Sequence, residues 1–318
     1  MSPLPTLLTR HSQLPIGFGG ASISGEGGGY GFGEISSDRA VTLLLHAVEL
    51  GVTIFDTAPV YGFGESERRI GKAFANCRDQ VFIVSKCGVD WHKSQRINMT
   101  NDPQVAAKML EESRQRLDSD YIDLYMIHWP DKRVDIRRPM ELLAKAKERG
   151  QIRHIGLSNT NADDLSAALE IAPVEAIQQE HNLFAPTTAT ALTKMIEKQR
   201  ISVMGYGTFD KGILTGRVTP QRQFDATDLR SWAPWWKNSR PDHRVKKAEK
   251  LLPILAEHQV GAVSFALSYN RFIRQVEISL CGVRNIEQLQ STLTALEQSP
   301  TEATINSILQ QYEQSDNS

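Results

Sequence analysis

Eight short apolar runs recur along this chain, and a segment with helical periodicity follows each of them. The runs are almost continuously apolar, as is typical of parallel strands that helices cover. Eight such units in 318 residues predict an α/β fold, a (β/α)8 or TIM barrel, forming a single domain over residues 1–318 with its core at about 14–297. The strands are expected at residues 14–19, 52–55, 81–86, 122–128, 154–157, 176–180, 202–206 and 277–281.

The segments between these strands carry helix signals. Ser37 is a good N-cap residue for the first helix, and Gly51 ends it, because glycine is favoured just after a helix. A long irregular loop is expected after the seventh strand, to about Pro241. It contains Trp232, Trp235 and Trp236, which fit the lining of a pocket and the packing of the loop equally well. The helices are expected at residues 37–50, 65–77, 102–117, 137–149, 162–169, 187–199, 245–258, 262–270 and 285–296, with a C-terminal helix at 301–311.

Two N-terminal segments have other patterns. Residues 1–13 predict a short polar segment with a small hairpin. Residues 25–33 are rich in glycine but lack the third glycine of a GxGxxG fingerprint, so they predict a mobile loop and not a phosphate cradle. A doubly wound sheet is the alternative fold, and the missing fingerprint disfavours it.

Composition excludes several classes of protein. A hydrophobic content of 40% and a charged content of 23% fit a globular protein, and a formal net charge of −1 argues against a nucleic-acid-binding surface. Three cysteines without CxxC spacing indicate reduced thiols. No signal-peptide core or membrane-length apolar run is present, so a cytoplasmic protein without a membrane partner is expected.

Polar residues stand where several predicted strands end. Asp56 follows the second strand, Lys86 ends the third and His128 ends the fourth, while Tyr61 lies on the loop after Asp56. Active sites of such barrels lie at this end of the strands. Further strand-end residues are Ser158, Asn159, Gln178, Glu180, Tyr206 and Arg284.

These residue types suit the addition of a hydride to a carbonyl group. A lysine held by an aspartate stays protonated and lowers the pKa of a nearby tyrosine, so Tyr61 can protonate the developing alkoxide. His128 can donate a hydrogen bond to the same oxygen. Two alternatives are a Schiff-base role for Lys86 and a metal-ligand role for His128, but no HxH or HExxH motif accompanies the histidine, and no metal is expected.

The chain resembles the aldo-keto reductases from Gly17 to about Leu296. The motifs that carry the resemblance are FDTAPVYG, VSKCG, MIHWP, HIGLSN, IQQEHN, GILTGR and CGVRNIEQL. The resemblance implies a catalytic tetrad of Asp56, Tyr61, Lys86 and His128, and a nicotinamide cofactor, NADP(H). The cofactor-binding residues that it implies are Gly19, Gly20, Asp56, Ser158, Asn159, Gln178, Tyr206 as the stacking ring, Gly207, Thr208, Phe209, Gly212, Leu214, Arg217, Gly282, Val283, Arg284 and Gln288.

The resemblance implies an oxidoreductase that reduces an aldehyde or ketone, or oxidises an alcohol or sugar. A nicotinamide-binding regulatory subunit is the alternative, because the family includes such proteins. Arg284 is expected to bind the 2′-phosphate of NADPH and so to select it over NADH. Gly207-Thr208-Phe209 replaces the usual Ser-Pro-Leu of the family.

Neither the small-molecule carbonyl substrate nor the oligomeric state can be read from the chain. Aromatic residues near the expected site predict a pocket for aryl or small aliphatic aldehydes, with Tyr61 and His128 contacting the substrate. These aromatic residues are Trp91, Trp129, Tyr30 and Phe32.

Overall fold

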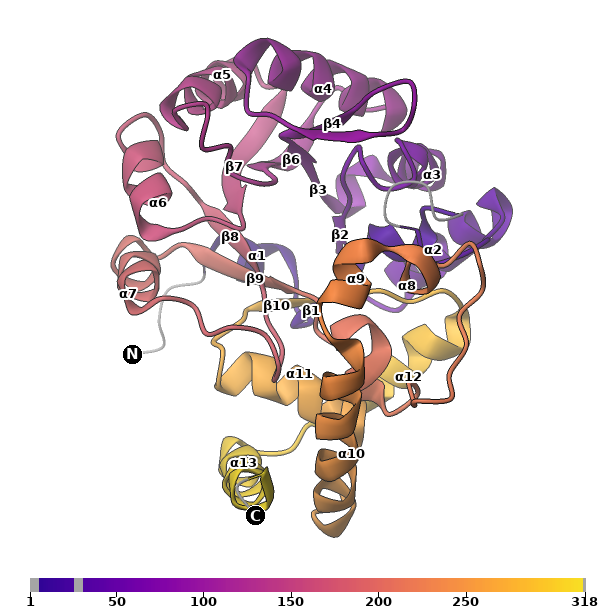
Figure 1. Cartoon of the computed structure of the whole chain (residues 1–318). Coiled ribbons are helices and arrows are strands. Elements are labelled where there is room, and N and C mark those ends of the chain that lie inside the picture. Colours follow the sequence, from indigo (N-terminus) through magenta and orange to yellow (C-terminus); the bar gives the residue numbers. More distant parts are fainter. Residues whose placement is uncertain (1–5, 26–30, 317–318) are drawn as a thin grey trace.

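Eight parallel strands close into a barrel in the computed structural model, which describes residues 6–25 and 31–316 (Figure 1). Their order around the barrel is β1-β10-β9-β8-β7-β6-β3-β2. The predicted (β/α)8 barrel is therefore confirmed, and the doubly wound alternative is wrong. The barrel strands are β1 (Ile16–Gly19), β2 (Ile54–Asp56), β3 (Phe82–Cys87), β6 (Ile122–Ile127), β7 (Ile152–Ser158), β8 (Ala176–Glu180), β9 (Ser202–Tyr206) and β10 (Ile278–Cys281).

Helices surround the barrel (Figure 1). One core layer fills the space between strands and helices, and a second fills the barrel interior with inward-facing residues such as Ile54, Val84 and Leu124. The helices are α2 (Ser37–Glu49), α3 (Glu65–Phe74), α4 (Pro103–Arg116), α5 (Arg137–Glu148), α6 (Ala162–Leu169), α7 (Thr190–Gln199), α10 (Pro241–Glu257), α11 (Ala262–Phe272), α12 (Ile286–Glu297) and α13 (Glu302–Asp316), with short 3-10 helices η1 (Gly20–Ile23) and η2 (Arg78–Gln80).

The N-terminal segment is a helix, so the predicted hairpin is wrong within its described part. Helix α1 (Leu7–His11) begins with a capping box in which Thr6 and Thr9 bond each other's backbone. Leu8 is fully buried among the residues that fill the barrel, and its amide donates to Ser202 Oγ at the start of β9. Helix α1 therefore plugs the barrel at the N-terminal ends of the strands.

One N-cap prediction is off by a residue. Ser36, and not Ser37, caps α2, because the Ser36 hydroxyl accepts from the Arg39 amide. Gly51 has the positive φ of 87° that makes glycine the favoured residue after that helix.

Two insertions on the barrel differ from the expected loops. An antiparallel hairpin of β4 (Val89–Trp91) and β5 (Ile97–Met99) follows β3. The segment after β9 is not wholly irregular, because it contains η3 (Asp210–Thr215), α8 (Leu229–Trp232) and α9 (Pro234–Asn238). Of its tryptophans, Trp236 is buried, whereas Trp232 and Trp235 are exposed.

No single helix in the described part of the chain is long and apolar enough to cross a membrane. Only α10 and α11 taken together meet the length and composition test, and they are bent by 97° at their junction.

Candidate active site

A buried ion pair lies at the carboxyl ends of β2 and β3. Lys86 is fully buried, and its ammonium donates to Asp56 Oδ1 at 2.6 Å and to the Thr57 carbonyl at 2.8 Å. Gln178 Nε2 from β8 donates to the same Asp56 oxygen at 2.7 Å. Three hydrogen bonds thus fix the lysine and aspartate side chains, as a buried charge pair requires.

Tyr61 is held over this pair by a tight loop. The Tyr61 amide donates to the Ala58 carbonyl, and its carbonyl accepts from the Ser66 amide at the start of α3. Gly62 has a φ of +63°, and a Cβ there would lie 2.2 Å from the Ser24 carbonyl oxygen, so only glycine fits. The FDTAPVYG sequence therefore encodes the turn that returns Tyr61 to the barrel mouth.

The four residues predicted as a tetrad come together. Lys86 Nζ lies 5.4 Å from the centroid of the Tyr61 ring. The His128 ring meets the Tyr61 ring edge-on, with centroids 6.0 Å apart and an interplanar angle of 88°. The cluster therefore combines a phenol, an ammonium and an imidazole at one point of the barrel mouth.

Burial lowers the pKa of two of these groups. It lowers the pKa of the Lys86 ammonium from its ordinary value, and the Asp56 carboxylate opposes that change. Burial, and then repulsion from Lys86, lower the pKa of His128 well below its ordinary value. His128 is therefore a neutral imidazole near pH 7, which suits hydrogen-bond donation to a carbonyl oxygen and not acid catalysis.

Asn159 connects two parts of the site. It has a φ of +53°, a conformation that asparagine tolerates better than most residues. Its Nδ2 donates to the His128 carbonyl at 3.0 Å and to Ser158 Oγ, while its Oδ1 accepts from the Tyr206 hydroxyl at 2.6 Å. Asn159 thus fixes the orientation of Tyr206 relative to His128.

A groove of about 370 Å³ runs from Tyr61 across the ends of β9, β1 and β10. Twelve of the predicted cofactor-binding residues line this cofactor groove: Gly19, Asp56, Tyr206, Gly207, Thr208, Phe209, Gly212, Arg217, Gly282, Val283, Arg284 and Gln288. Gly19 and Gly282 contribute no side chain, and a Cβ on Gly282 would lie 3.4 Å from Ser22 Cβ. A glycine-walled groove with cations along it fits an extended dinucleotide.

The other predicted cofactor-binding residues lie beside or below this groove. Ser158, Asn159 and Gln178 stand at the neighbouring strand ends. Gly20 packs so closely that a Cβ would lie 2.6 Å from the Asp56 carbonyl oxygen. Leu214 is buried in a core cluster with α10 and α11, so the structure does not place its side chain in the groove.

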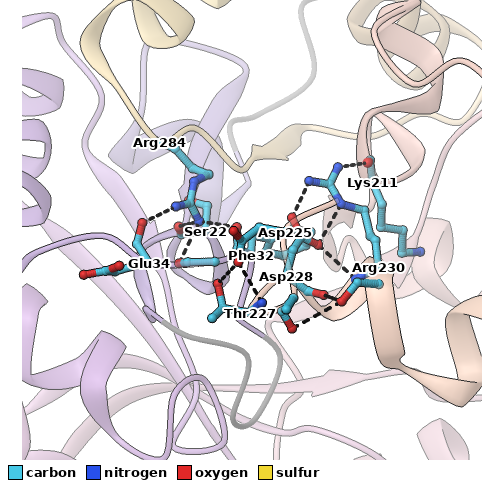
Figure 2. A network of polar contacts seen from close by, with 12 residues as sticks. Ser22, Phe32, Glu34, Lys211, Asp225, Thr227, Asp228, Arg230 and Arg284 are labelled. Atoms are coloured by element: carbon cyan, nitrogen blue, oxygen red, sulfur yellow. Dashed lines mark hydrogen bonds and ion pairs between the residues drawn. The ribbon is translucent and has the colours of Figure 1, made fainter. Parts of the chain in front are cut away.

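Arg284 has a structural task that the sequence did not reveal (Figure 2). Its guanidinium donates to the carbonyl oxygens of Phe32 at 2.6 Å, Gly33 at 3.1 Å and Glu34 at 2.7 Å. These bonds hold the loop at 31–34 over the groove and use the side chain that was expected to bind a 2′-phosphate.

The loop at 31–34 also meets the segment after β9 (Figure 2). Phe32 forms an isolated antiparallel bridge with Asp228, and the Leu229 amide donates to the Gly31 carbonyl at 3.1 Å. We call residues 31–34 and 225–230 the arch. The sequence does not predict this contact, because no pattern in it specifies pairing between loops so far apart.

Two further groove residues were also missed. Lys211 lines the groove and pairs with Glu180 Oε1 at 2.6 Å. The Arg230 guanidinium binds both carboxylate oxygens of Asp228 and donates to the Lys211 carbonyl at 2.7 Å. Lys211 could have been found from its place directly before the GILTGR motif, whereas Arg230 gave no signal.

Some of the aromatic residues that were expected around the substrate lie at the mouth of the barrel. The Trp129 ring lies 6.5 Å from the His128 ring and is 38% exposed, so it is available to a ligand. Trp91, on the β4–β5 hairpin, packs 5.3 Å from the Phe63 ring. Phe32 lines the groove, and Tyr30 lies outside the described residues. Among residues 6–25 and 31–316, no three His, Cys, Asp or Glu side chains cluster as a metal site would require.

Comparison with known proteins identifies relatives of the chain. The model of the Aldo/keto reductase family matches residues 15–313. The aldo-keto reductase YhdN of Bacillus subtilis is 32% identical over 83% of this chain and 80% of its own length. The NADP(+)-labelled aldo-keto reductase yakc of Schizosaccharomyces pombe is 27% identical over 96% of this chain and 90% of its length.

Two further similarities bear on cofactor and fold. The NADH-specific methylglyoxal reductase of Escherichia coli is 28% identical over 93% of this chain and 94% of its length. The glycerol dehydrogenase of Gluconobacter oxydans has a solved structure with a TM-score of 0.79 and 27% identity, covering 94% of this chain and 92% of its own.

Proposed function

Because this chain belongs to the aldo/keto reductase family, we propose that it transfers a hydride from a nicotinamide cofactor to the carbonyl group of an aldehyde or ketone. The observation that carries the proposal is the Asp56-bound ammonium of Lys86 below the Tyr61 ring, with His128 edge-on to the same ring. A cofactor in the groove would supply the hydride. The reverse oxidation of an alcohol or sugar uses the same residues.

The side chains divide the work at the carbonyl oxygen. Tyr61 donates the proton that the developing alkoxide needs. The Lys86 ammonium stabilises negative charge on the phenol oxygen, and Asp56 with Gln178 keeps that ammonium in place. Neutral His128 donates a hydrogen bond that orients and polarises the carbonyl.

The groove-lining residues are proposed to hold the cofactor in an extended form. Tyr206, fixed by Asn159, would stack on the nicotinamide ring, with Ser158, Asn159 and Gln178 bonding its amide. Gly207 to Arg217 and Gly282 to Gln288 would bind the phosphates and adenosine. We propose NADPH as the preferred cofactor because Arg217, an exposed cation, lines the groove. One similar protein is labelled NADP(+) and another NADH-specific.

The test is cofactor oxidation, followed by absorbance, with NADPH and NADH against a panel of aryl and small aliphatic aldehydes. Turnover of at least one aldehyde with NADPH supports the proposal. A protein that binds NADPH but turns over no aldehyde or ketone, and no alcohol in reverse, would instead fit a nicotinamide-binding protein without catalysis.

A further inference from the structure

A second cavity lies outside the barrel mouth. It has a volume of about 590 Å³ and is enclosed by residues 218–224 on one side and by α9 and the first turns of α10 on the other. This volume falls in the ordinary range of small-molecule sites. No residue proposed to act on the carbonyl lines it.

The lining of this second cavity includes apolar side chains. Val218 and Phe224 are half-buried, whereas Trp236 and Val245 behind them are buried. Half-buried apolar side chains can contact an aromatic or aliphatic body and remove part of it from water.

The rim of the cavity is cationic. Four exposed side chains line it: Arg222, Lys237, Arg240 and Lys246. Within the described residues, none of these four side chains makes an ion pair or a side-chain hydrogen bond. One carboxylate, Asp242, and the imidazole of His243 also line the cavity.

Two neighbouring arginines, by contrast, have carboxylate partners. Arg230, which also lines the cavity, is paired with Asp228, and Arg244 donates to Asp210 Oδ2 at 2.6 Å. Arginines with a structural task in this region therefore have carboxylate partners. The whole chain has a net charge of −1, so a cationic rim does not follow from its composition.

The N-terminus of helix α10 adds positive charge beside the cationic rim. Pro241, Asp242 and His243 at its start border the cavity, and the N-terminus of a 17-residue helix carries a partial positive charge. Phosphate groups satisfy both guanidinium and ammonium donors, and do so better than neutral groups.

We propose that this second cavity binds a small organic phosphate, with its apolar or aromatic body against Val218 and Phe224 and its phosphate on the rim formed by Arg222, Lys237, Arg240 and Lys246. The site is distinct from the cofactor groove, although four residues border both: Val218, Arg222, Phe224 and Arg230. The proposed ligand is a free small molecule. The test below distinguishes it from a phosphate group on a membrane surface.

The experiment is a calorimetric titration of the full chain, saturated with NADPH so that the cofactor groove is filled, with phenyl phosphate and with inorganic phosphate as probes. One saturable site per chain, with a Kd below about 1 mM for phenyl phosphate and weaker binding of inorganic phosphate, is expected. Higher ionic strength should weaken both, since the rim is exposed.

Matched variants localise the binding. Lys237→Glu with Arg240→Glu reverses two charges that line the second cavity and not the groove, and it should weaken phenyl phosphate at least about tenfold while NADPH affinity is retained. Lys194→Glu changes an exposed cation on α7 that lines neither the groove nor the second cavity, and should leave phenyl phosphate binding within about twofold.

Three results would overturn the proposal. The first is no saturable binding of phenyl phosphate. The second is binding that the double variant leaves unchanged. The third is co-sedimentation with vesicles of phosphatidylcholine containing phosphatidic acid, lost in the double variant, without binding of either soluble probe, which would assign the rim to a membrane surface.

Discussion

At the scale of single residues, the chemistry depends on how one ammonium is held. The Lys86 side chain is fully buried. The Asp56 carboxylate and the Thr57 carbonyl accept hydrogen bonds from its ammonium and so favour the charged form. Desolvation alone would favour the neutral amine, and a nearby carboxylate restores the charged form. The identity of residue 86 should therefore matter more for turnover than for cofactor binding.

Lys86→Met tests this dependence. It removes the ammonium and keeps an apolar side chain of similar length, so turnover should fall by about two orders of magnitude or more. The basic limb of the pH–rate profile should move to higher pH, because the variant has neither an ionisable ammonium nor its stabilisation of the Tyr61 phenolate. Trapping of a carbonyl substrate on Lys86 of the wild-type protein by borohydride would instead indicate a Schiff-base lysine.

At the scale of elements, the strand-end residues could be predicted from the sequence, whereas the loop contacts of the arch could not. Asp56, Lys86 and His128 come directly after apolar runs, and parallel strands bring their ends to one mouth whatever the exact register. Contacts between Arg284 and residues 32–34 depend on loop paths that no periodicity encodes. The α1 helix was missed similarly, because five residues are too few for a periodic signal.

Arg284→Ala tests the role of the arch. Since the guanidinium binds the carbonyls of residues 32–34, the variant should weaken NADPH and NADH by a similar factor, about tenfold. Arg217→Ala is the comparison, because Arg217 is an exposed cation that lines the same groove. The measurement is fluorescence titration of both cofactors. If Arg284→Ala loses affinity for NADPH alone, Arg284 binds the 2′-phosphate and the arch account is wrong.

Glu175 joins α5 to β7 and gives a pH-dependent contribution to stability. Burial raises the pKa of its carboxyl, but hydrogen bonds from His154 and Lys147 lower it to about 2. Because the folded pKa lies below the unfolded value, the stabilisation is present above pH of about 4.3 and is lost as pH falls toward 2.

The measurement is denaturant unfolding of Glu175→Gln and the wild type at several pH values. The variant should be less stable by about 2 kcal/mol at pH 6, and the difference should shrink by pH 3. Glu170→Gln, which breaks an exposed pair with Arg137, should change stability far less than Glu175→Gln does. A difference for Glu175→Gln that does not depend on pH would contradict the ion-pair account.

At the scale of the whole molecule, the two ends of the barrel have separate tasks. The carboxyl ends of the strands form the mouth with the tetrad and groove, while α1 closes the opposite end through Leu7 and Leu8. Changes at the plug should therefore alter stability without altering chemistry.

Leu8→Ala should lower the free energy of unfolding by about 2–5 kcal/mol, because Leu8 is fully buried in the barrel interior. At a temperature where the variant is folded, kcat/KM should stay within about twofold of the wild type. Leu45→Ala is the control, since Leu45 is 39% exposed on α2 and its loss should cost less than about 1 kcal/mol. A large loss of kcat/KM in folded Leu8→Ala would show that the two ends are coupled.

The most direct test of the proposed chemistry is the rate of carbonyl reduction by Tyr61→Phe. Cofactor deuterated at C4 is used alongside to verify that hydride transfer limits the rate, and NADPH affinity is measured in parallel. The proposed role predicts a loss of about two to four orders of magnitude in turnover with NADPH affinity nearly unchanged, because only the acidic proton is removed. Turnover near that of the wild type, with hydride transfer still limiting, would contradict Tyr61 as the proton donor.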